Sequence, residues 1–187
     1  CIRDSHGPTP MRPGELIASD RGARASRPDD LHQAWTVLEQ VMDPEVPVVS
    51  VVDLGIVRDL DWADGHLRVT VTPTYSGCPA TEVIEQDIRS ALEQAGFEAP
   101  ALQRQLSPAW TTDWISASGR ERLRAYGIAA PAGSSNKRSL LGEPDVIACP
   151  QCGSSHTEVL SEFGSTACKA LYRCCDCREP FDYFKCI

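Results

Sequence analysis

Hydrophobic residues recur at helical spacing in two segments of the chain. The first segment begins after Asp29 and Asp30, which can cap a helix, and it ends at Pro44. Its apolar positions are Leu31, Ala34, Trp35, Leu38, Val41 and Met42. The second segment ends at Gly96, and its apolar face comprises Val83, Ile84, Ile88, Ala91, Leu92 and Ala95. Both patterns predict amphipathic helices.

Between these helices the hydrophobic period shortens to two residues. Apolar and polar side chains alternate from Leu67 to Val71, which predicts a strand that is buried on one face. Residues 56–62 predict the strand before it, and Asp64 and Gly65 are typical of a hairpin turn between the two. The second helix then follows a short polar loop.

Further segments complete the first domain. Residues 101–107 predict a third strand, and residues 46–52 are rich in β-branched side chains. Thr112 or Asp113 can cap a third helix. Its apolar residues are Ile115, Leu123 and Tyr126. This order of elements predicts a small α+β domain, an α/β sandwich, over residues 29–127.

The segments outside this domain differ in composition. Residues 1–28 hold many Pro, Gly and Arg without a sustained apolar period, so we expect a disordered leader. Residues 128–144 are rich in Ala, Gly, Ser and Pro and predict an exposed linker. Residues 145–187 contain seven of the nine cysteines and form a separate module.

Four cysteines of this module form two Cys-x-x-Cys pairs, Cys149 with Cys152 and Cys174 with Cys177. Two such pairs supply four thiolates, which suits tetrahedral Zn²⁺, and the gap between them accommodates two strands. We therefore expect a structural zinc β-ribbon. Two disulfides or a cluster of buried free thiols are the alternatives.

The other residues of the module have no assigned role. We expect Cys175 to point away from the metal and His156 to lie on the surface, while the roles of Cys168 and Cys186 stay open. Three aromatic residues, Phe181, Tyr183 and Phe184, form either the small core of the ribbon or a docking face for another protein.

Cys78 lies where the polar loop meets the second helix. Pro79 suits the first helical position, which would place Cys78 at or near the N-cap. Unpaired backbone N–H groups and the helix dipole stabilise a thiolate there. Such a thiolate can be a nucleophile, a redox sensor or an iron ligand; the alternative is a small buried apolar residue.

Three acidic residues earlier in the chain are weaker candidates. Asp43, Glu45 and Asp53 can help to hold a metal or bind a partner. Asp beside Pro or Gly is also ordinary turn chemistry, so the alternative is that Asp43 and Asp53 shape turns while Glu45 is solvated.

Composition excludes several classes of function. The 187 residues carry a net charge of −8, which disfavours binding to nucleic acid. We find neither an apolar run long enough to span a membrane nor a signal-peptide pattern. Nine cysteines in this arrangement suit a reducing cytoplasm. The sequence contains no Ser-His-Asp arrangement, P-loop or dinucleotide fingerprint, which argues against an enzyme.

Two pairs of motifs resemble known families. Residues 43–57 and Thr74-Tyr-Ser-Gly-Cys-Pro79 resemble the iron–sulfur assembly domain of SufT-like proteins. Residues 163–174 and 179–187 resemble the zinc ribbon of the PaaD family of bacterial phenylacetate degradation. The resemblance covers the chain from about residue 29 to its end, except the linker.

This resemblance implies an accessory role beside the multicomponent phenylacetyl-CoA epoxidase. It implies that Cys78 is a transient ligand of iron or an iron–sulfur cluster, with Asp43, Glu45 and Asp53 in the second signature of the domain. The implied partners are the oxygenase or reductase subunits or the iron–sulfur assembly machinery; a homodimer also stays open. The sequence lacks the paired Glu-x-x-His motifs of a di-iron oxygenase.

Three hypotheses follow. The first is a non-catalytic maturation factor that installs an iron centre in the epoxidase. The second is a rubredoxin-like electron carrier with iron on the four tail cysteines; Gly153 fits the Gly that follows each rubredoxin knuckle, whereas Arg178 does not. The third, which ranks last because no base is visible, is a catalytic nucleophile at Cys78.

Overall fold

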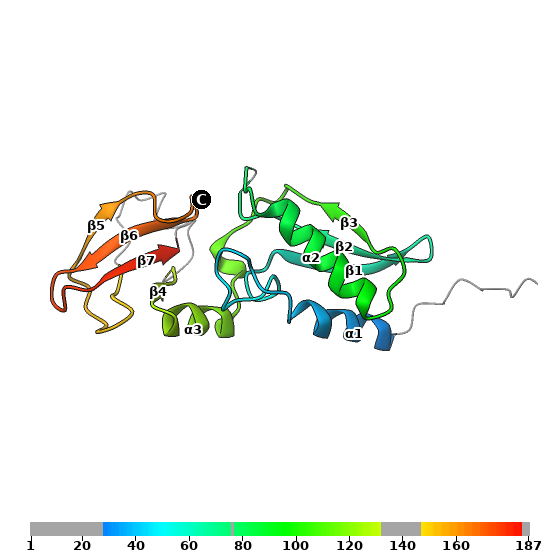
Figure 1. Ribbon diagram of the computed structural model, residues 1–187, viewed down its shortest axis with the longest axis horizontal. Coiled ribbons are helices and arrows are strands. Elements are labelled where there is room, and N and C mark those ends of the chain that lie inside the picture. Colours follow the sequence, from blue (N-terminus) through cyan, green and yellow to red (C-terminus); the bar gives the residue numbers. More distant parts are fainter. Residues whose placement is uncertain (1–27, 76, 132–146, 185–187) are drawn as a thin grey trace, which may run out of the picture.

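The protein is described here from a computed structural model, which describes residues 28–75, 77–131 and 147–184. The predicted leader except Pro28, most of the predicted linker and Cys186 lie outside these residues. Within the described part, none of the helices combines the length and apolar character needed to cross a lipid bilayer. The chain forms two sheets that lie side by side (Figure 1).

The first sheet begins with a hairpin of β1 (Val57–Ala63) and β2 (His66–Val71). Asp64 and Gly65 adopt φ values of 52° and 81°, so the turn has the left-handed conformation that an Asp-Gly hairpin requires. The predicted hairpin is therefore confirmed. Leu67, an inward-facing residue of β2, is 1 % exposed.

The third strand joins this hairpin through a helix. β3 (Ala101–Arg104) pairs with β2 in parallel, and parallel strands need a crossover connection, which α2 (Thr81–Gln94) provides. α2 lies across one face of the sheet, and α1 (Pro28–Leu38) packs against both α2 and β1 (Figure 1). The fold is α+β, as the sequence predicts.

Two segments near the start of the domain differ from what their local sequence suggests. The first helix ends at Leu38, and Met42 pairs with Ser50 in an isolated bridge. Residues 46–52 form turns, because Pro44 and Pro47 interrupt the ladder. The β-branched residues of this segment fill the core instead, with Val49 fully buried.

The third predicted helix is divided into two. η1 (Thr112–Trp114) is capped by Thr111, and α3 (Ala117–Ala125) is capped by Ser116, whose hydroxyl accepts the N–H of Gly119 at 2.8 Å. The expected cap at Thr112 or Asp113 is wrong, because the Ser116 hydroxyl also bonds to a distant residue of the first domain.

The tail forms a second, four-stranded sheet. β5 (Thr157–Ser161), β6 (Lys169–Cys174) and β7 (Pro180–Phe184) are antiparallel neighbours. β4 (Ile128–Ala129) pairs with β7 in parallel, so the segment expected to be a linker starts with a buried strand. Phe181 and Tyr183 pack with Tyr172 in the core of this sheet.

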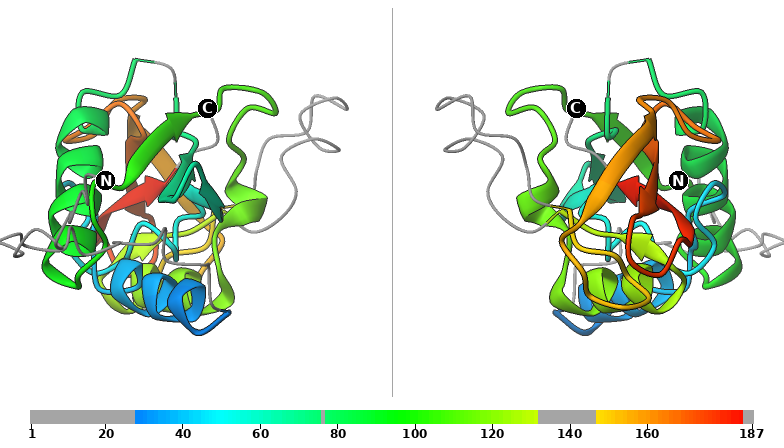
Figure 2. Two further views of the ribbon diagram at one scale, coloured as in Figure 1. Left: turned by 90° about the vertical axis from the view of Figure 1, so that its right-hand side faces the viewer. Right: turned by 90° about the vertical axis from the view of Figure 1, so that its left-hand side faces the viewer.

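The end of β7 leaves the ribbon and enters the core of the first domain. Phe184 is 2 % exposed, and its ring meets that of Trp110 edge-on, with 6.0 Å between the centroids. Cys168, just before β6, is buried in the same core. The two sheets therefore share one core at their junction, and in Figure 2, which looks down the long axis, one sheet lies behind the other.

This shared core predicts that Phe184→Ala destabilises the whole protein. Loss of a buried aromatic side chain lowers the free energy of unfolding by about 3–5 kcal/mol. Urea unfolding, followed by tryptophan fluorescence, measures this change. Phe163→Ala is the matched control, because Phe163 is 68 % exposed in the same ribbon, and it should change the free energy of unfolding by less than about 0.5 kcal/mol. Equal losses in both variants would contradict a shared core.

Candidate functional site

Cys78 lies in the turn that precedes α2. The N-cap of this helix is Ala80 and its first residue is Thr81, so Cys78 lies two residues before the cap, and the expected position of Pro79 within the helix is wrong. The Cys78 carbonyl accepts the N–H of Thr81 at 3.2 Å. Its side chain is half-buried and packs against the main core.

A small cavity lies beside Cys78 at the junction of the two sheets. It has about 20 Å³ of space open to the centre of a water molecule, enough for one water-sized occupant. Its apolar wall contains Val46, Leu54, Ile56, Val71, Ile84 and Phe184. Its polar wall contains Asp43, Glu45, Thr74, Cys78, Thr81, Glu85 and Cys168. Two cysteines and three acidic residues thus line one cavity.

Asp43 shapes the loop on one side of the cavity. Its Oδ1 atom accepts the N–H groups of Glu45 and Val46 at 2.9 and 2.8 Å. Burial raises the pKa of the Asp43 carboxyl, although these two hydrogen bonds oppose the shift. This carboxylate therefore holds the backbone from which Glu45 projects.

Glu45 reaches across the junction to the ribbon. Its Oε2 atom lies 3.7 Å from the Sγ atom of Cys168, which lies 3.0 Å from the hydroxyl of Thr166. Burial raises the pKa of the Cys168 thiol, while the Thr166 hydroxyl lowers it. The expectation of a solvated Glu45 overlooked this contact.

Asp53 lies in a separate network, outside the lining of the cavity. Its carboxylate accepts hydrogen bonds from the hydroxyls of Ser116 and Ser118 at 2.7 and 2.9 Å and pairs with Arg122 at 2.7 Å. Although burial alone would raise the pKa of Asp53, these partners and the N–H of Ser50 lower it overall. Asp53 thereby ties its turn to the start of α3.

Gly55 explains the Asp-Leu-Gly sequence of this turn. Its φ is +67°, and a Cβ atom there would lie 2.7 Å from both the Cβ and the carbonyl oxygen of Trp114. Only glycine permits this conformation and this close approach together.

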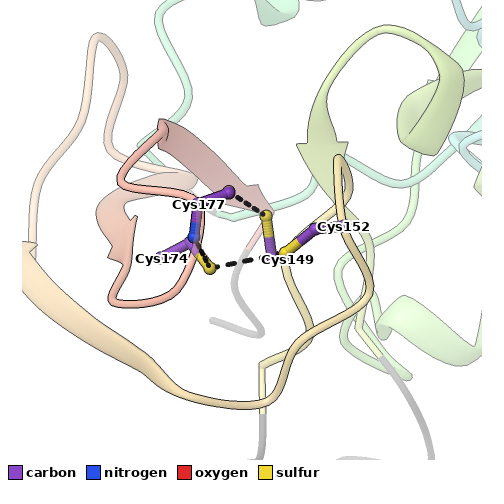
Figure 3. A group of neighbouring side chains, drawn as sticks. All are labelled: Cys149, Cys152, Cys174 and Cys177. Atoms are coloured by element: carbon purple, nitrogen blue, oxygen red, sulfur yellow. Dashed lines mark hydrogen bonds between the residues drawn. The ribbon is translucent and has the colours of Figure 1, made fainter.

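The four predicted metal ligands of the ribbon converge. Cys149 and Cys152 come from one loop, and Cys174 and Cys177 come from the turn between β6 and β7 (Figure 3). All four sulfur atoms lie within 4.8 Å of one another, with 3.7 Å between Cys149 and Cys177 and 3.5 Å between Cys152 and Cys174. Tetrahedral bonds of about 2.3 Å place sulfurs about 3.8 Å apart, so the cluster fits one metal ion.

The backbone stabilises the thiolate of one cysteine in this cluster, Cys174. The N–H of Cys177 points at the Cys174 sulfur at 3.5 Å, and this contact contributes most to lowering the pKa of Cys174 to about 6. A bound cation would deprotonate all four thiols. Cys175 does not belong to the group, and His156 is exposed and pairs with Asp176 at 3.1 Å, so neither is part of the cluster.

Cys168 is the site residue to which sequence reasoning assigned no role. It lies outside both Cys-x-x-Cys pairs, and no local spacing connects it to Cys78. Tyr75 was also missed: burial, followed by the charges of Cys78, Cys168 and Glu45, raises the pKa of its hydroxyl. The sequence feature that could have identified Tyr75 is its position three residues before Cys78.

Two adjacent cysteines provide a direct test of the metal cluster. Cys174→Ser should lose the bound metal and unfold the ribbon, because closed thiolate sites contribute folding free energy outright. Cys175→Ser should retain about one metal ion per chain. Elemental analysis and hydrogen exchange of β5–β7 check both variants; metal retention in Cys174→Ser would contradict the assignment.

The network of Asp53 predicts a pH-dependent loss of stability. Asp53→Asn should cost about 1.5–3 kcal/mol at pH 7, because it weakens charge-assisted hydrogen bonds. Since the folded pKa of Asp53 is lowered, its contribution is present above the unfolded value of about 3.9 and disappears as the pH falls through the folded value. Urea unfolding at pH 7 and pH 3 measures the free energies of unfolding of the parent protein and of Asp53→Asn, and the difference between them should be smaller at pH 3.

An exposed aspartate on α2 supplies the control. Asp87→Asn should change the free energy of unfolding by less than about 0.5 kcal/mol at either pH. A constant difference between Asp53→Asn and the parent protein across this pH range would contradict the role of the ionised carboxylate.

Comparisons with known proteins cover both domains. Residues 31–97 match the family model described as "Iron-sulfur cluster assembly protein", and residues 133–185 match the "PaaD zinc beta ribbon domain". A "Fe-S protein maturation auxiliary factor" of Porphyromonas gingivalis is 38% identical over 43% of this chain and 77% of its own length. A crystal structure of a domain of unknown function, DUF59, from Bacillus anthracis superposes with a TM-score of 0.48 and 26% identity, over 51% of this chain and 92% of that chain.

One relative extends over both domains. It is an Escherichia coli protein named as a subunit of a "Putative 1,2-phenylacetyl-CoA epoxidase". The two chains are 53% identical over 160 residues, which are 86% of this chain and 95% of the relative. The similarity therefore includes the assembly domain, the ribbon and their junction. Because this chain contains both matched domains and covers nearly all of that relative, it belongs to the PaaD family.

Proposed function

We propose that this chain is a non-catalytic maturation factor that helps to install an iron or iron–sulfur centre in the multicomponent phenylacetyl-CoA epoxidase. The observation that carries the proposal is Cys78, half-buried at a cavity that also holds carboxylates, within an iron–sulfur assembly domain. A thiolate beside carboxylates binds iron.

The acidic residues support Cys78 in different ways. Asp43 holds the loop of Glu45 in place, and Glu45 faces the cavity. Asp53 acts at a distance by fixing the turn that packs beneath the cavity, since Leu54 lines the cavity wall. We assign direct contact with iron to Cys78 and a supporting role to Asp53.

The ribbon serves folding and docking. Cys149, Cys152, Cys174 and Cys177 hold Zn²⁺, and four protein ligands leave no coordination position for a substrate. We place this work in the cytoplasm, where thiols stay reduced. The oxygenase or the reductase of the epoxidase, or the iron–sulfur assembly machinery, would be the partner, and a homodimer is compatible with this role.

Cys78 is the residue whose loss tests this proposal. In cells that depend on the epoxidase, Cys78→Ser should lower epoxidase activity and the iron content of its subunits by about tenfold or more, because a direct ligand is lost. Cys175→Ser removes a half-buried thiol outside the cavity and should leave both values unchanged. Normal activity and iron content with Cys78→Ser would refute the role of Cys78.

An electron carrier is the second candidate, because one feature of the knuckles favours it. Gly153 and Arg178 follow the second cysteine of each knuckle, and both adopt left-handed φ values, 76° and 69°. Arg178 therefore reproduces the backbone conformation for which rubredoxin-like knuckles use glycine. A purified chain that is red and holds iron in the four-cysteine cluster would favour this candidate, whereas a colourless zinc protein would exclude it.

A further inference from the structure

The two knuckles of the ribbon, residues 149–152 and 174–177, are joined by side chains other than their metal ligands. The carboxylate of Asp176, inside the second knuckle, accepts the hydroxyl hydrogen of Ser154, which follows the first knuckle. The other oxygen of this carboxylate, Oδ1, lies 3.1 Å from Nδ1 of His156. One carboxylate of the second knuckle thus holds two residues that follow the first.

Backbone hydrogen bonds fix the partners of this carboxylate. The hydroxyl oxygen of Ser154 accepts the N–H of His156 at 3.0 Å, while its hydrogen goes to Asp176. The N–H of Cys175 donates to the carbonyl of His156 at 2.8 Å, and that of Cys149 donates to the carbonyl of Ser154 at 2.8 Å. We call the group of Ser154, His156 and Asp176 the knuckle clasp.

The clasp lies next to two of the sulfur atoms that face each other. Cys152 and Cys174 are 3.5 Å apart and come from the two opposed loops in Figure 3. The N–H of Ser154 lowers the pKa of Cys152, although the Cys174 thiol and burial raise it overall. The N–H of Cys177 and then that of Asp176 lower the pKa of Cys174. The two residues whose side chains meet therefore also support the sulfurs through their backbones.

The position of the clasp on the surface decides which property it affects. The side chains of His156 and Asp176 are 73% and 57% exposed, and exposed charge pairs contribute little to the stability of a whole protein. Metal release requires less than unfolding, because opening one knuckle frees an exposed ligand such as Cys152. Such an opening separates the knuckles and breaks the clasp. The clasp should therefore change the rate of metal release more than the free energy of unfolding.

We propose that Ser154 and Asp176 are positioning residues of the ribbon metal site, which hold the two knuckles together and slow the release of the bound metal. Contacts behind the ligands keep ligands oriented in metal sites. The inference rests on the structural role that the proposed function gives to the ribbon, and it does not depend on Cys78. A factor that carries iron at one site needs a structural metal that stays in place at the other.

The test measures metal release from the full-length protein loaded with Zn²⁺. An excess of a chromophoric chelator takes up the Zn²⁺, and its absorbance gives the release rate. Asp176→Asn and Ser154→Ala should each release Zn²⁺ about fivefold faster or more, because each removes the hydrogen bond between the knuckles. The double variant should be no faster than the faster single variant, since both changes remove the same interaction.

Conservative and neighbouring substitutions are the controls. Ser154→Thr keeps the hydroxyl and should release Zn²⁺ at a rate within about twofold of that of the parent protein. Ser155→Ala and Glu179→Gln change exposed residues beside the knuckles, outside the clasp, and should also stay within about twofold. Co²⁺ bound in place of Zn²⁺ should give the same thiolate-to-metal charge-transfer band in the parent and in Asp176→Asn, because all four thiolates remain.

Three results would overturn the proposal. The first is release of Zn²⁺ at the rate of the parent by both Asp176→Asn and Ser154→Ala. The second is equal acceleration in Ser155→Ala or Glu179→Gln, which would make the effect common to any substitution near the knuckles. The third is an altered Co²⁺ band in Asp176→Asn, which would mean that this residue changes the coordination itself.

This inference and the proposed function fail in different ways. If the clasp variants release Zn²⁺ at the rate of the parent while Cys78→Ser lowers epoxidase activity in cells, the clasp is wrong and the proposed function stands. If the clasp variants release Zn²⁺ faster but Cys78→Ser cells mature the epoxidase normally, the clasp stands and the proposed function is wrong.

Discussion

The packing of Phe184 against Trp110 is the contact on which the candidate site depends. Trp110 is itself fixed, because its indole N–H donates to the carbonyl of Leu54 at 2.9 Å. Leu54 belongs to the turn between Asp53 and Gly55 and also lines the cavity. The last strand of the ribbon, one aromatic pair and the signature turn thus form a continuous packed unit, and Cys168 and Cys78 both line the cavity beside it.

The two groups of cysteines differ in their surroundings. The ribbon cluster has four protein ligands, converges from two tight loops and stabilises a small sheet. The junction cavity is lined by two cysteines and by acidic residues, and its lining comes from both domains. A metal ion bound by the four ribbon cysteines would stabilise the cavity indirectly, because it would order the ribbon that carries Cys168.

Asp43 and Asp53 show why an acidic signature is ambiguous in sequence. Asp43 precedes Pro44 and Asp53 lies two residues before Gly55, and each carboxylate accepts a backbone N–H of its own turn. Asp43 nevertheless lines the cavity, whereas Asp53 faces two hydroxyls and Arg122. A carboxylate that shapes a turn can therefore also support the site around Cys78. Asp43 and Asp53 differ in that only Asp43 lines the cavity beside Cys78.

Local patterns in the sequence determined the amphipathic helices, the Asp-Gly hairpin and the two cysteine pairs, because each depends on residues that are neighbours in the chain. The division of the third helix at Ser116 and the turns of residues 46–52 could not be predicted, because distant contacts with Asp53 and the core override local propensity. Only the tertiary structure placed Cys168 beside Glu45, since that proximity results from packing Phe184 into the first domain. No spacing within either segment encodes it.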